Sequence, residues 1–328
     1  MTIKDIAKEA GVSSAAVSRY FNGGSLGEEK QKRIKAVVEK YHYVPNQAAQ
    51  SMRTGKSGQI GVIVPKIHSD SLSQIMHGIA DGLSENDYNM ILGLTEGAVE
   101  KEVQYINMMT LSKLEGIILM GTTMTPHLRN TIERCPIPIV ITGQAFEGFP
   151  CVYYDDQNAM RELAQLMLKK RKNIAYIGAP ETDPAVGIKR KEGVIKAFKE
   201  MDKDPSKLIS VETSGFDMRH GYTSMKELFS KKKKIDGVLC ATDSLALGAM
   251  KAIREKKLSI PDDIAIAGIG NNLAGQVTTP ELTTVRLYFE QCGQTAARML
   301  REMIENGKEG YPISQIKLGY EIIERESI

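Results

Sequence analysis

The sequence predicts an α/β protein with an N-terminal all-α head and a two-lobed body in which parallel sheets are flanked by helices. From residue 58 onward, short apolar runs alternate with amphipathic segments, which is the pattern of βαβ units. The head, up to about residue 56, shows helical patterns only, and residues 1–60 are strongly basic. They hold ten Lys and Arg residues against five Asp and Glu, whereas the remaining residues hold 33 against 35. A length of 328 residues suits two or three domains, so the body has room for two α/β units.

The composition excludes several classes of protein. Hydrophobic residues make 42% of the chain and charged residues 25%, which are values of globular proteins. No apolar run reaches the roughly 18 residues of a membrane span, and the N-terminus has no apolar signal core, so we expect a cytoplasmic protein with no membrane partner. The four cysteines, Cys135, Cys151, Cys240 and Cys292, form no CxxC pair, so we expect free thiols, no metal and no cofactor.

Three helices are expected in the head, residues 1–45. Thr2 can cap the first helix with Asp5 three residues later, close to a capping box, and Gly11 can end it in the left-handed conformation. Ser13 can cap a second helix that ends near Asn22, and a third helix is expected over residues 28–40. Two short helices joined by a glycine-containing turn and braced by a third are typical of a helix-turn-helix.

The second helix carries residues suited to reading DNA. Ser14, Ala15 and Ala16 are small, so they let the backbone approach base edges in the major groove and leave room for thymine methyl groups. Arg19 can reach a guanine or a phosphate, and basic residues of the third helix attract phosphates without sequence preference. The alternative is a generic three-helix cap with a solvated basic face, and the pattern favours DNA binding over it.

Residues 46–56 are expected to form a hinge helix and linker. Pro45 stops the third helix, and Asn46 can cap a helix of about eight residues, which is too short to be stable alone. Such a helix can fold against a partner copy and DNA, with Met52 as an apolar wedge in the minor groove. The alternative is a plain linker with an isolated methionine, which composition alone favours.

The body alternates expected strands and helices. The runs expected to be strands are 60–64, 90–94, 116–120, 137–141, 151–154, 174–178, 237–241 and 264–268, and amphipathic segments between them include 72–83, 99–111, 159–170 and 245–256. Small and polar residues follow many of the strands, so two facing sheets would form a ligand cleft at their carboxyl ends. No Gly-rich phosphate-binding motif follows a strand.

Several stretches of the head resemble one family of transcriptional regulators, the lactose/galactose repressor (LacI-type) family. These stretches are Thr2-Ile3-Lys4-Asp5-Ile6-Ala7, Ala10-Gly11-Val12-Ser13, Ala16-Val17-Ser18-Arg19-Tyr20-Phe21-Asn22, Tyr43-Val44-Pro45-Asn46 and Ala48-Ala49-Gln50-Ser51-Met52. The similarity continues through the body, where it looks closest to sucrose-operon and trehalose-operon repressors. The resemblance implies a homodimer that places the second helix in the major groove and a hinge helix in the minor groove of palindromic operator DNA.

The resemblance also assigns the DNA contacts residue by residue. They are Thr2, Ser13, Ser14, Ala15, Ser18, Arg19, Asn22, Asn46, Ala49 and Met52. Family members usually carry Leu at the position of Met52. Methionine has a similar volume and more flexibility, so we expect the wedge to persist with less rigidity.

For the body, the resemblance implies a fold like that of periplasmic sugar-binding proteins, with three crossovers between the lobes. Lobe one would comprise about 57–157 and 287–316, and lobe two about 158–286 and 317–328. The effector would lie between them and contact Lys66, Gln144, Arg190, Phe216, Thr242 and Asn271. Arg190 matches the arginine that the family uses to hold ligand hydroxyls or carboxylates. At Gly270 and Asn271 many members have two aspartates instead.

Two of these assignments have a structural alternative, and three nearby aspartates are expected to have structural roles. Arg190 can belong to a solvated helix face, Phe216 to a core, and Asp243 and Asp155-Asp156 can be helix caps. Lys66 stands where some sugar-phosphate sensors have a basic residue, but the trehalose type has arginine at the position of Gln144. The sequence therefore leaves open whether the ligand is phosphorylated.

The function predicted from the sequence is a sequence-specific transcriptional repressor controlled by a small sugar or sugar phosphate, such as the disaccharides sucrose or trehalose. One alternative is a global carbon-catabolite regulator that needs a phosphorylated partner protein, and another is a sugar receptor without DNA function. An enzyme is not expected, because the sequence has no nucleophile elbow, HExxH motif or phosphate loop, so no catalytic residue is assigned.

Overall fold

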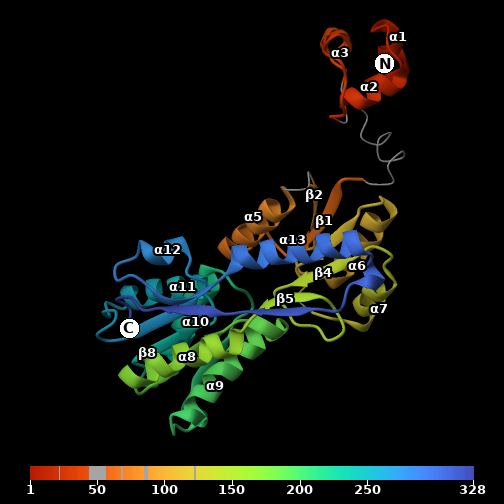
Figure 1. The fold of residues 1–328 in the computed structure, drawn as a ribbon. Coiled ribbons are helices and arrows are strands. Elements are labelled where there is room, and N and C mark those ends of the chain that lie inside the picture. Colours follow the sequence, from red (N-terminus) through yellow and green to blue (C-terminus); the bar gives the residue numbers. More distant parts are fainter. Residues whose placement is uncertain (22, 44–56, 68, 85–87, 122) are drawn as a thin grey trace. The chain divides into compact units, whose positions relative to one another are not determined.

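The computed structural model describes residues 1–21, 23–43, 57–67, 69–84, 88–121 and 123–328 (Figure 1). The chain forms two compact units, Met1–Ser57 and Gly58–Ile328. Asn22, Asn46, Ala49 and Met52 lie outside the described residues, so the hinge helix and these four DNA contacts stay predictions. No helix in the described part of the chain is long and apolar enough to cross a membrane.

The first unit contains the three predicted helices, α1 (Ile3–Glu9), α2 (Ser14–Phe21) and α3 (Glu28–Lys40). A capping box begins α1: the Thr2 hydroxyl accepts from the Asp5 amide at 3.3 Å, and the Asp5 carboxylate accepts from the Thr2 amide at 2.7 Å. Gly11 follows α1 with φ +62°, as its role in the turn requires. Ile6, Val17 and Ile34 are fully buried, so one apolar residue from each helix forms the centre of this small core.

The second unit contains two six-stranded sheets. The first sheet has the order β11-β5-β4-β3-β1-β2 and is parallel throughout, with strands β1 (Gln59–Val64), β2 (Asn89–Leu94), β3 (Gly116–Leu119), β4 (Ile139–Thr142), β5 (Cys151–Tyr154) and β11 (Gln315–Leu318). The second has the order β12-β10-β9-β8-β6-β7, with strands β6 (Ile174–Gly178), β7 (Ile209–Glu212), β8 (Gly237–Cys240), β9 (Ala265–Ile269), β10 (Thr283–Leu287) and an antiparallel β12 (Tyr320–Ile323).

Helices cover the sheets as the βαβ pattern predicts. The helices of the body are α5 (Asp70–Ser84), α6 (Val99–Leu111), α7 (Pro126–Arg134), α8 (Asp156–Lys170), α9 (Arg190–Glu200), α10 (Met218–Ser230), α11 (Asp243–Glu255), α12 (Leu273–Gln276) and α13 (Phe289–Asn306). Alternate residues of β1 face opposite cores, because Val62 packs in the core that includes α5 and α13 whereas Ile63 packs with α6 and α7. A π-helical turn, Pro184–Lys189, precedes α9, and short 3₁₀ turns occupy Pro205–Lys207 and Lys308–Gly310.

The chain passes between the two sheets three times, after β5, after β10 and after β11 (Figure 1). The first sheet extends to Leu318, two residues beyond the boundary predicted for lobe one; the other lobe boundaries stay predictions. The eight predicted strands are present, but β7, β10, β11 and β12 were not predicted. Three of these four, β7, β11 and β12, are edge strands. An edge strand buries few side chains: only Val211 is buried in β7 and only Leu318 in β11. The sequences of β7 and β11 therefore need no continuous apolar run.

Glycines let pairs of helices approach closely in both halves of the body. A Cβ added at Gly78 of α5 would lie 2.0 Å from the Glu290 carbonyl oxygen of α13. In α11, a Cβ added at Gly248 would lie 1.9 Å from the Met218 carbonyl oxygen of α10. Since real Cβ contacts are much longer, any larger residue would push these helices apart.

We predict that Gly248→Ala destabilises the body by about 2 kcal/mol or more, because α10 and α11 must separate to admit the methyl group. Urea unfolding followed by circular dichroism measures the change. Gly319→Ala is the matched control, since a Cβ there meets no atom within 4 Å, and it should be neutral or slightly stabilising. Equal midpoints for the two variants would contradict the close approach of these helices.

Glu102 is an ionisable residue that is buried in the interior of the first half of the body. Its side chain on α6 is 1% exposed, and neither carboxylate oxygen has a hydrogen-bond partner. Burial, with a smaller contribution from Glu100, raises the pKa of Glu102 to about 7. The carboxyl group is therefore neutral in the folded protein at mildly acidic pH, whereas it is ionised in the unfolded chain.

We predict that the stability difference between Glu102→Gln and the wild type depends on pH. The folded pKa lies above the unfolded value of 4.5, so ionisation costs the wild type stability as pH rises from 4.5 to 7 and the full cost persists above 7. The variant should gain about 3 kcal/mol over the wild type at pH 8 and little at pH 4. Denaturant unfolding at several pH values tests this, and a pH-independent difference would contradict it.

Candidate functional site

The surface expected to read DNA lies on α2. Ser13, Ser14, Ala15 and Arg19 are exposed and Ser18 is half-buried, so the structure presents all five as a surface of the head. Ala16 was expected to face DNA together with Ser14 and Ala15. It is instead only 5% exposed and packs in the core of the head.

Two of the predicted DNA contacts also serve as helix caps. The Ser13 hydroxyl accepts from the backbone amide of Ala16 at 3.2 Å. The Thr2 hydroxyl donates to the Asp5 carboxylate at 2.9 Å, so its proton is already used within the head. Arg19, by contrast, is an exposed residue with a long cationic side chain, and among these residues it is best suited to extend toward a base or phosphate.

A cavity of about 1330 Å³ lies within the body at the carboxyl ends of strands from both sheets. Residues after β1 and β3 of the first sheet line it, and so do residues after β8 and β9 of the second. The strand order reverses between β1 and β3 in the first sheet and between β6 and β8 in the second. Open α/β sheets bind ligands at such points of reversal. Of the six predicted effector contacts, five line this cavity: Lys66, Gln144, Arg190, Phe216 and Thr242.

Arg190 is buried at the floor of the cavity and is not part of a solvated helix face. Its Nε donates to Asp156 Oδ1 at 2.7 Å, its Nη2 lies 2.6 Å from the same oxygen, and its Nη1 donates to the Ala241 carbonyl oxygen at 2.5 Å. Burial raises the pKa of Asp156, and the positive charge of Arg190 opposes that rise. Three of the five guanidinium N–H groups are used in this way, so two are left for a ligand.

Lys66 follows β1 and Phe216 follows β7, and the two side chains contact one another in the lining of the cavity. The Lys66 ammonium nitrogen lies 4.2 Å from the centroid of the Phe216 ring, a cation–π contact. Burial lowers the pKa of Lys66, whereas the carboxylates of Asp183 and Asp217 oppose the change. The pair offers an aromatic face and a cation to one ligand.

Gln144 connects the two halves of the body. Its side-chain amide, after β4, donates to Asp183 Oδ1 at 2.8 Å, and the same oxygen accepts from the backbone amides of Ala185 and Val186. Beside it, the Thr123 hydroxyl donates to the Thr182 carbonyl oxygen at 2.7 Å. These contacts join segments of the first sheet to the turn that precedes Arg190.

Thr242 caps α11, since its hydroxyl accepts from the Leu245 amide at 3.2 Å. Asp243 was a candidate cap, but it is the first residue of the helix and accepts from the Thr284 hydroxyl at 2.6 Å and the Asn272 amide at 2.9 Å. Burial raises the pKa of Asp243 to about 6. Asp156 was likewise a candidate cap, whereas the structure pairs it with Arg190.

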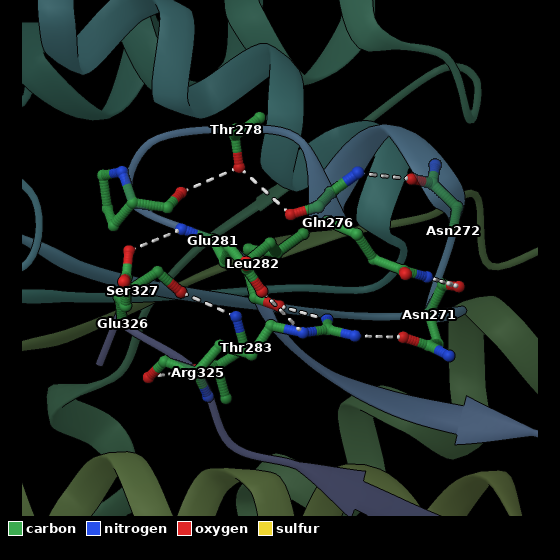
Figure 2. Close-up of polar contacts among 12 residues, drawn as sticks. Asn271, Asn272, Gln276, Thr278, Glu281, Leu282, Thr283, Arg325, Glu326 and Ser327 are labelled. Atoms are coloured by element: carbon green, nitrogen blue, oxygen red, sulfur yellow. Dashed lines mark hydrogen bonds and ion pairs between the residues drawn. The ribbon is translucent and has the colours of Figure 1, made fainter.

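Asn271 is the one predicted effector contact that does not line the large cavity. It lies outside the large cavity, has φ +49°, and its side-chain oxygen accepts from Arg325 Nη2 at 2.7 Å (Figure 2). Its neighbour Asn272 lines the cavity instead and caps α12 by accepting from the Gly275 amide at 2.9 Å. The left-handed conformation of Asn271 turns its side chain toward the C-terminal segment, which is a feature that spacing along the chain does not reveal.

The fold and the cavity define a helix-turn-helix unit joined to a body like that of the periplasmic binding proteins. Two family models match the chain: "Bacterial regulatory proteins, lacI family" over residues 2–46 and "Periplasmic binding protein-like domain" over residues 163–328. The sucrose operon repressor of Staphylococcus xylosus is 29% identical over 305 residues, which cover 93% of this chain and 94% of that protein. The transcriptional regulator RegA of Clostridium saccharobutylicum is 30% identical over 332 residues, covering 99% and 98%.

The chain belongs to the lacI family of bacterial regulatory proteins. It is a DNA-binding transcriptional regulator and not an enzyme, as its relatives are regulators. Among solved structures, the lac repressor dimer bound to operator and the anti-inducer ONPF matches with a TM-score of 0.89 at 20% identity, over 100% of this chain and 98% of that one. That match shows the shared fold.

We predict that Asp156→Asn destabilises the body by about 3 kcal/mol, because it removes the carboxylate that is directly paired with the buried Arg190. Thermal unfolding at neutral pH measures the effect. Asp155→Asn is the control one residue away: Asp155 pairs with the half-exposed Lys317 at 2.9 Å, and its loss should cost about 1 kcal/mol or less. A smaller loss for Asp156→Asn than for Asp155→Asn would contradict the importance of the buried pair.

Proposed function

We propose that this protein is a homodimeric repressor whose affinity for a palindromic operator is controlled by a small sugar or sugar phosphate bound in the cavity. A disaccharide such as sucrose or trehalose is the proposed effector class. The DNA contacts in this proposal are those of α2 and the predicted hinge, residues 46–56. The proposed location is the cytoplasm, where a DNA-binding regulator meets its operator.

The observation that carries the effector proposal is the orientation of Arg190 at the floor of the cavity. Asp156 and the Ala241 carbonyl hold the guanidinium, and two N–H groups stay available for a neighbouring pair of hydroxyls. The Phe216 ring offers a flat apolar face on which the C–H groups of a sugar ring can pack, and Gln144 adds an amide. The similarity to a sucrose operon repressor supports a disaccharide.

Lys66 bears on whether the effector is phosphorylated. It is the only lysine among the described residues that line the cavity, and its ammonium group lies against Phe216. A phosphate on the sugar can reach this ammonium group, because Lys binds phosphate as a point charge. Asp183 and Asp217 lie close enough to influence the charge of Lys66. Their carboxylates would therefore repel a phosphate group bound beside Lys66. These opposing charges make the neutral sugar the first candidate.

Control of DNA binding would act through the contacts between the two halves of the body. An effector that competes with the Gln144–Asp183 hydrogen bond or the Lys66–Phe216 contact changes the relative stability of open and closed arrangements. A coupling free energy of about 1–3 kcal/mol changes operator affinity roughly 5- to 150-fold. Exposed apolar side chains on β2 and α12, such as Leu92 and Leu273, offer surface for the proposed dimer.

Fluorescence anisotropy tests the whole proposal. The probe is a labelled palindromic duplex from upstream of this protein's own gene, and sucrose, trehalose, maltose and their 6-phosphates are added one at a time. Release or tightening by one sugar supports the proposal and identifies the effector. Tight binding that no sugar changes would favour the regulator that needs a phosphorylated partner protein, and failure to bind any palindromic duplex would favour a sugar receptor without DNA function.

We predict that Arg19→Ala weakens binding to this duplex at least tenfold, because a side chain that reads a base or a phosphate is lost. The same anisotropy titration measures it. Lys113→Ala, an exposed change on the body, is the control and should bind like the wild type. Unchanged affinity of the Arg19→Ala variant would remove Arg19 from the DNA-reading surface.

A further inference from the structure

Three segments that contain clustered Lys and Arg residues lead into adjacent strands of the second sheet, and the first two of them are strongly basic. They are 169–173 before β6, 231–236 before β8 and 254–264 before β9. These three strands are neighbours and run parallel, so their amino ends share one edge of the sheet, opposite the edge that lines the cavity. Neighbouring strands lie about 4.8 Å apart, so the topology places the three segments side by side.

Contacts between the segments confirm that they touch. The backbone amides of Lys172 and Asn173 donate to Asp236 Oδ1 at 3.0 and 2.7 Å, which joins the first segment to the second. The Arg171 guanidinium donates to the Pro261 carbonyl oxygen at 2.6 Å, which joins the first segment to the third. We call the exposed surface of these three segments the basic edge.

The basic edge carries far more positive charge than its local structure needs. The three segments hold eleven Lys and Arg residues against four Asp and Glu, a net charge of +7. Residues 61–328 hold 33 against 35, so the rest of that stretch carries −9. Helices α8, α10 and α11 end here, and each carboxyl end is equivalent to about half a negative charge, so roughly five positive charges are left over.

Most of these cations are available to a partner. Within the described residues, six exposed lysines of the basic edge have no ion pair and no side-chain hydrogen bond: Lys169, Lys172, Lys232, Lys233, Lys234 and Lys257. Other cations are already engaged, since Lys170 pairs with Glu324 and Lys231 with Glu227. Exposed lysines that repel one another are stabilised by a polyanion, which lowers that repulsion.

The chemistry of the basic edge favours nucleic acid over a protein partner. No large hydrophobic side chain is exposed in these three segments, whereas protein interfaces depend on buried aromatic and aliphatic residues at their centres. Lysine is also depleted in such interfaces. Flexible lysines without aromatic neighbours suit the regular phosphates of a duplex, which they contact without reading the bases.

We propose that the basic edge is a second, sequence-independent contact surface for the phosphate backbone of duplex DNA, separate from the helix-turn-helix. The basic edge belongs to the body, Gly58–Ile328, so its contribution is independent of the contacts that the head makes. The surface lets the body hold a DNA segment that carries no operator.

The test uses the full-length protein and a labelled random-sequence duplex of about 30 base pairs without a palindrome. The variant combines Lys172→Glu, Lys233→Glu and Lys234→Glu. Its control combines Lys113→Glu, Arg134→Glu and Arg298→Glu, three exposed cations elsewhere in the body, so the net charge changes equally. The head is the same in all three proteins, and thermal unfolding with circular dichroism checks that each is folded.

Anisotropy titrations between about 50 and 200 mM salt give the result. The basic-edge variant should bind roughly tenfold more weakly at the lowest salt. The negative slope of log affinity against log salt should become shallower by about 2 to 3, since three phosphate contacts are lost. The control variant should keep the wild-type slope.

Two outcomes would overturn the proposal. One is a basic-edge variant that keeps the wild-type slope, and the other is an equal loss in the control, which would show an effect of net charge alone. Polyglutamate is titrated in parallel: if the basic-edge variant loses binding to it and keeps binding to the duplex, the partner is an acidic polypeptide and DNA is excluded.

Discussion

The buried ion pair between Arg190 and Asp156 is the interaction on which the arrangement of the cavity depends. Asp156 begins α8 just after the chain first crosses between the two sheets, and Arg190 begins α9 after the π-helical turn. The third partner is the carbonyl group of Ala241, the residue that directly follows β8. A desolvated pair of charges is stable only when its geometry is well satisfied, so these three segments have little freedom to move apart.

Around this pair, the cavity is built from the carboxyl ends of strands that belong to different halves of the body. Gln144 and Lys66 come from the first sheet, and they meet Asp183 and Phe216 of the second half. Each contact is modest, and together they define one arrangement that a ligand can stabilise or replace. Charge is separated as well: the cavity combines both signs, whereas the amino edge of the second sheet is basic.

Much of the fold follows from local sequence patterns. Buried strands such as β3 and β8 are continuous apolar runs, because parallel sheets covered on both faces need them. Three of the four edge strands escaped prediction, whereas β2 was predicted from its apolar run. Strands β7 and β11 bury few side chains and are held by their pairing partners. In the candidate site, the sequence identified five cavity-lining residues, but it missed Asp156, Asp183 and Asn272, whose roles come from partners far along the chain.

The sequence by itself determined the helices of the head, the alternation of strands and helices, and the resemblance to a repressor family, because caps, periodicity and motifs are properties of neighbouring residues. Only the tertiary structure decided that Arg190 pairs with a residue 34 positions away and that Asn271 turns toward Arg325 and away from the cavity. Likewise, the three segments of the basic edge form one surface only because the parallel strands β6, β8 and β9 bring their amino ends together. These features depend on long-range packing, which spacing along the chain does not encode.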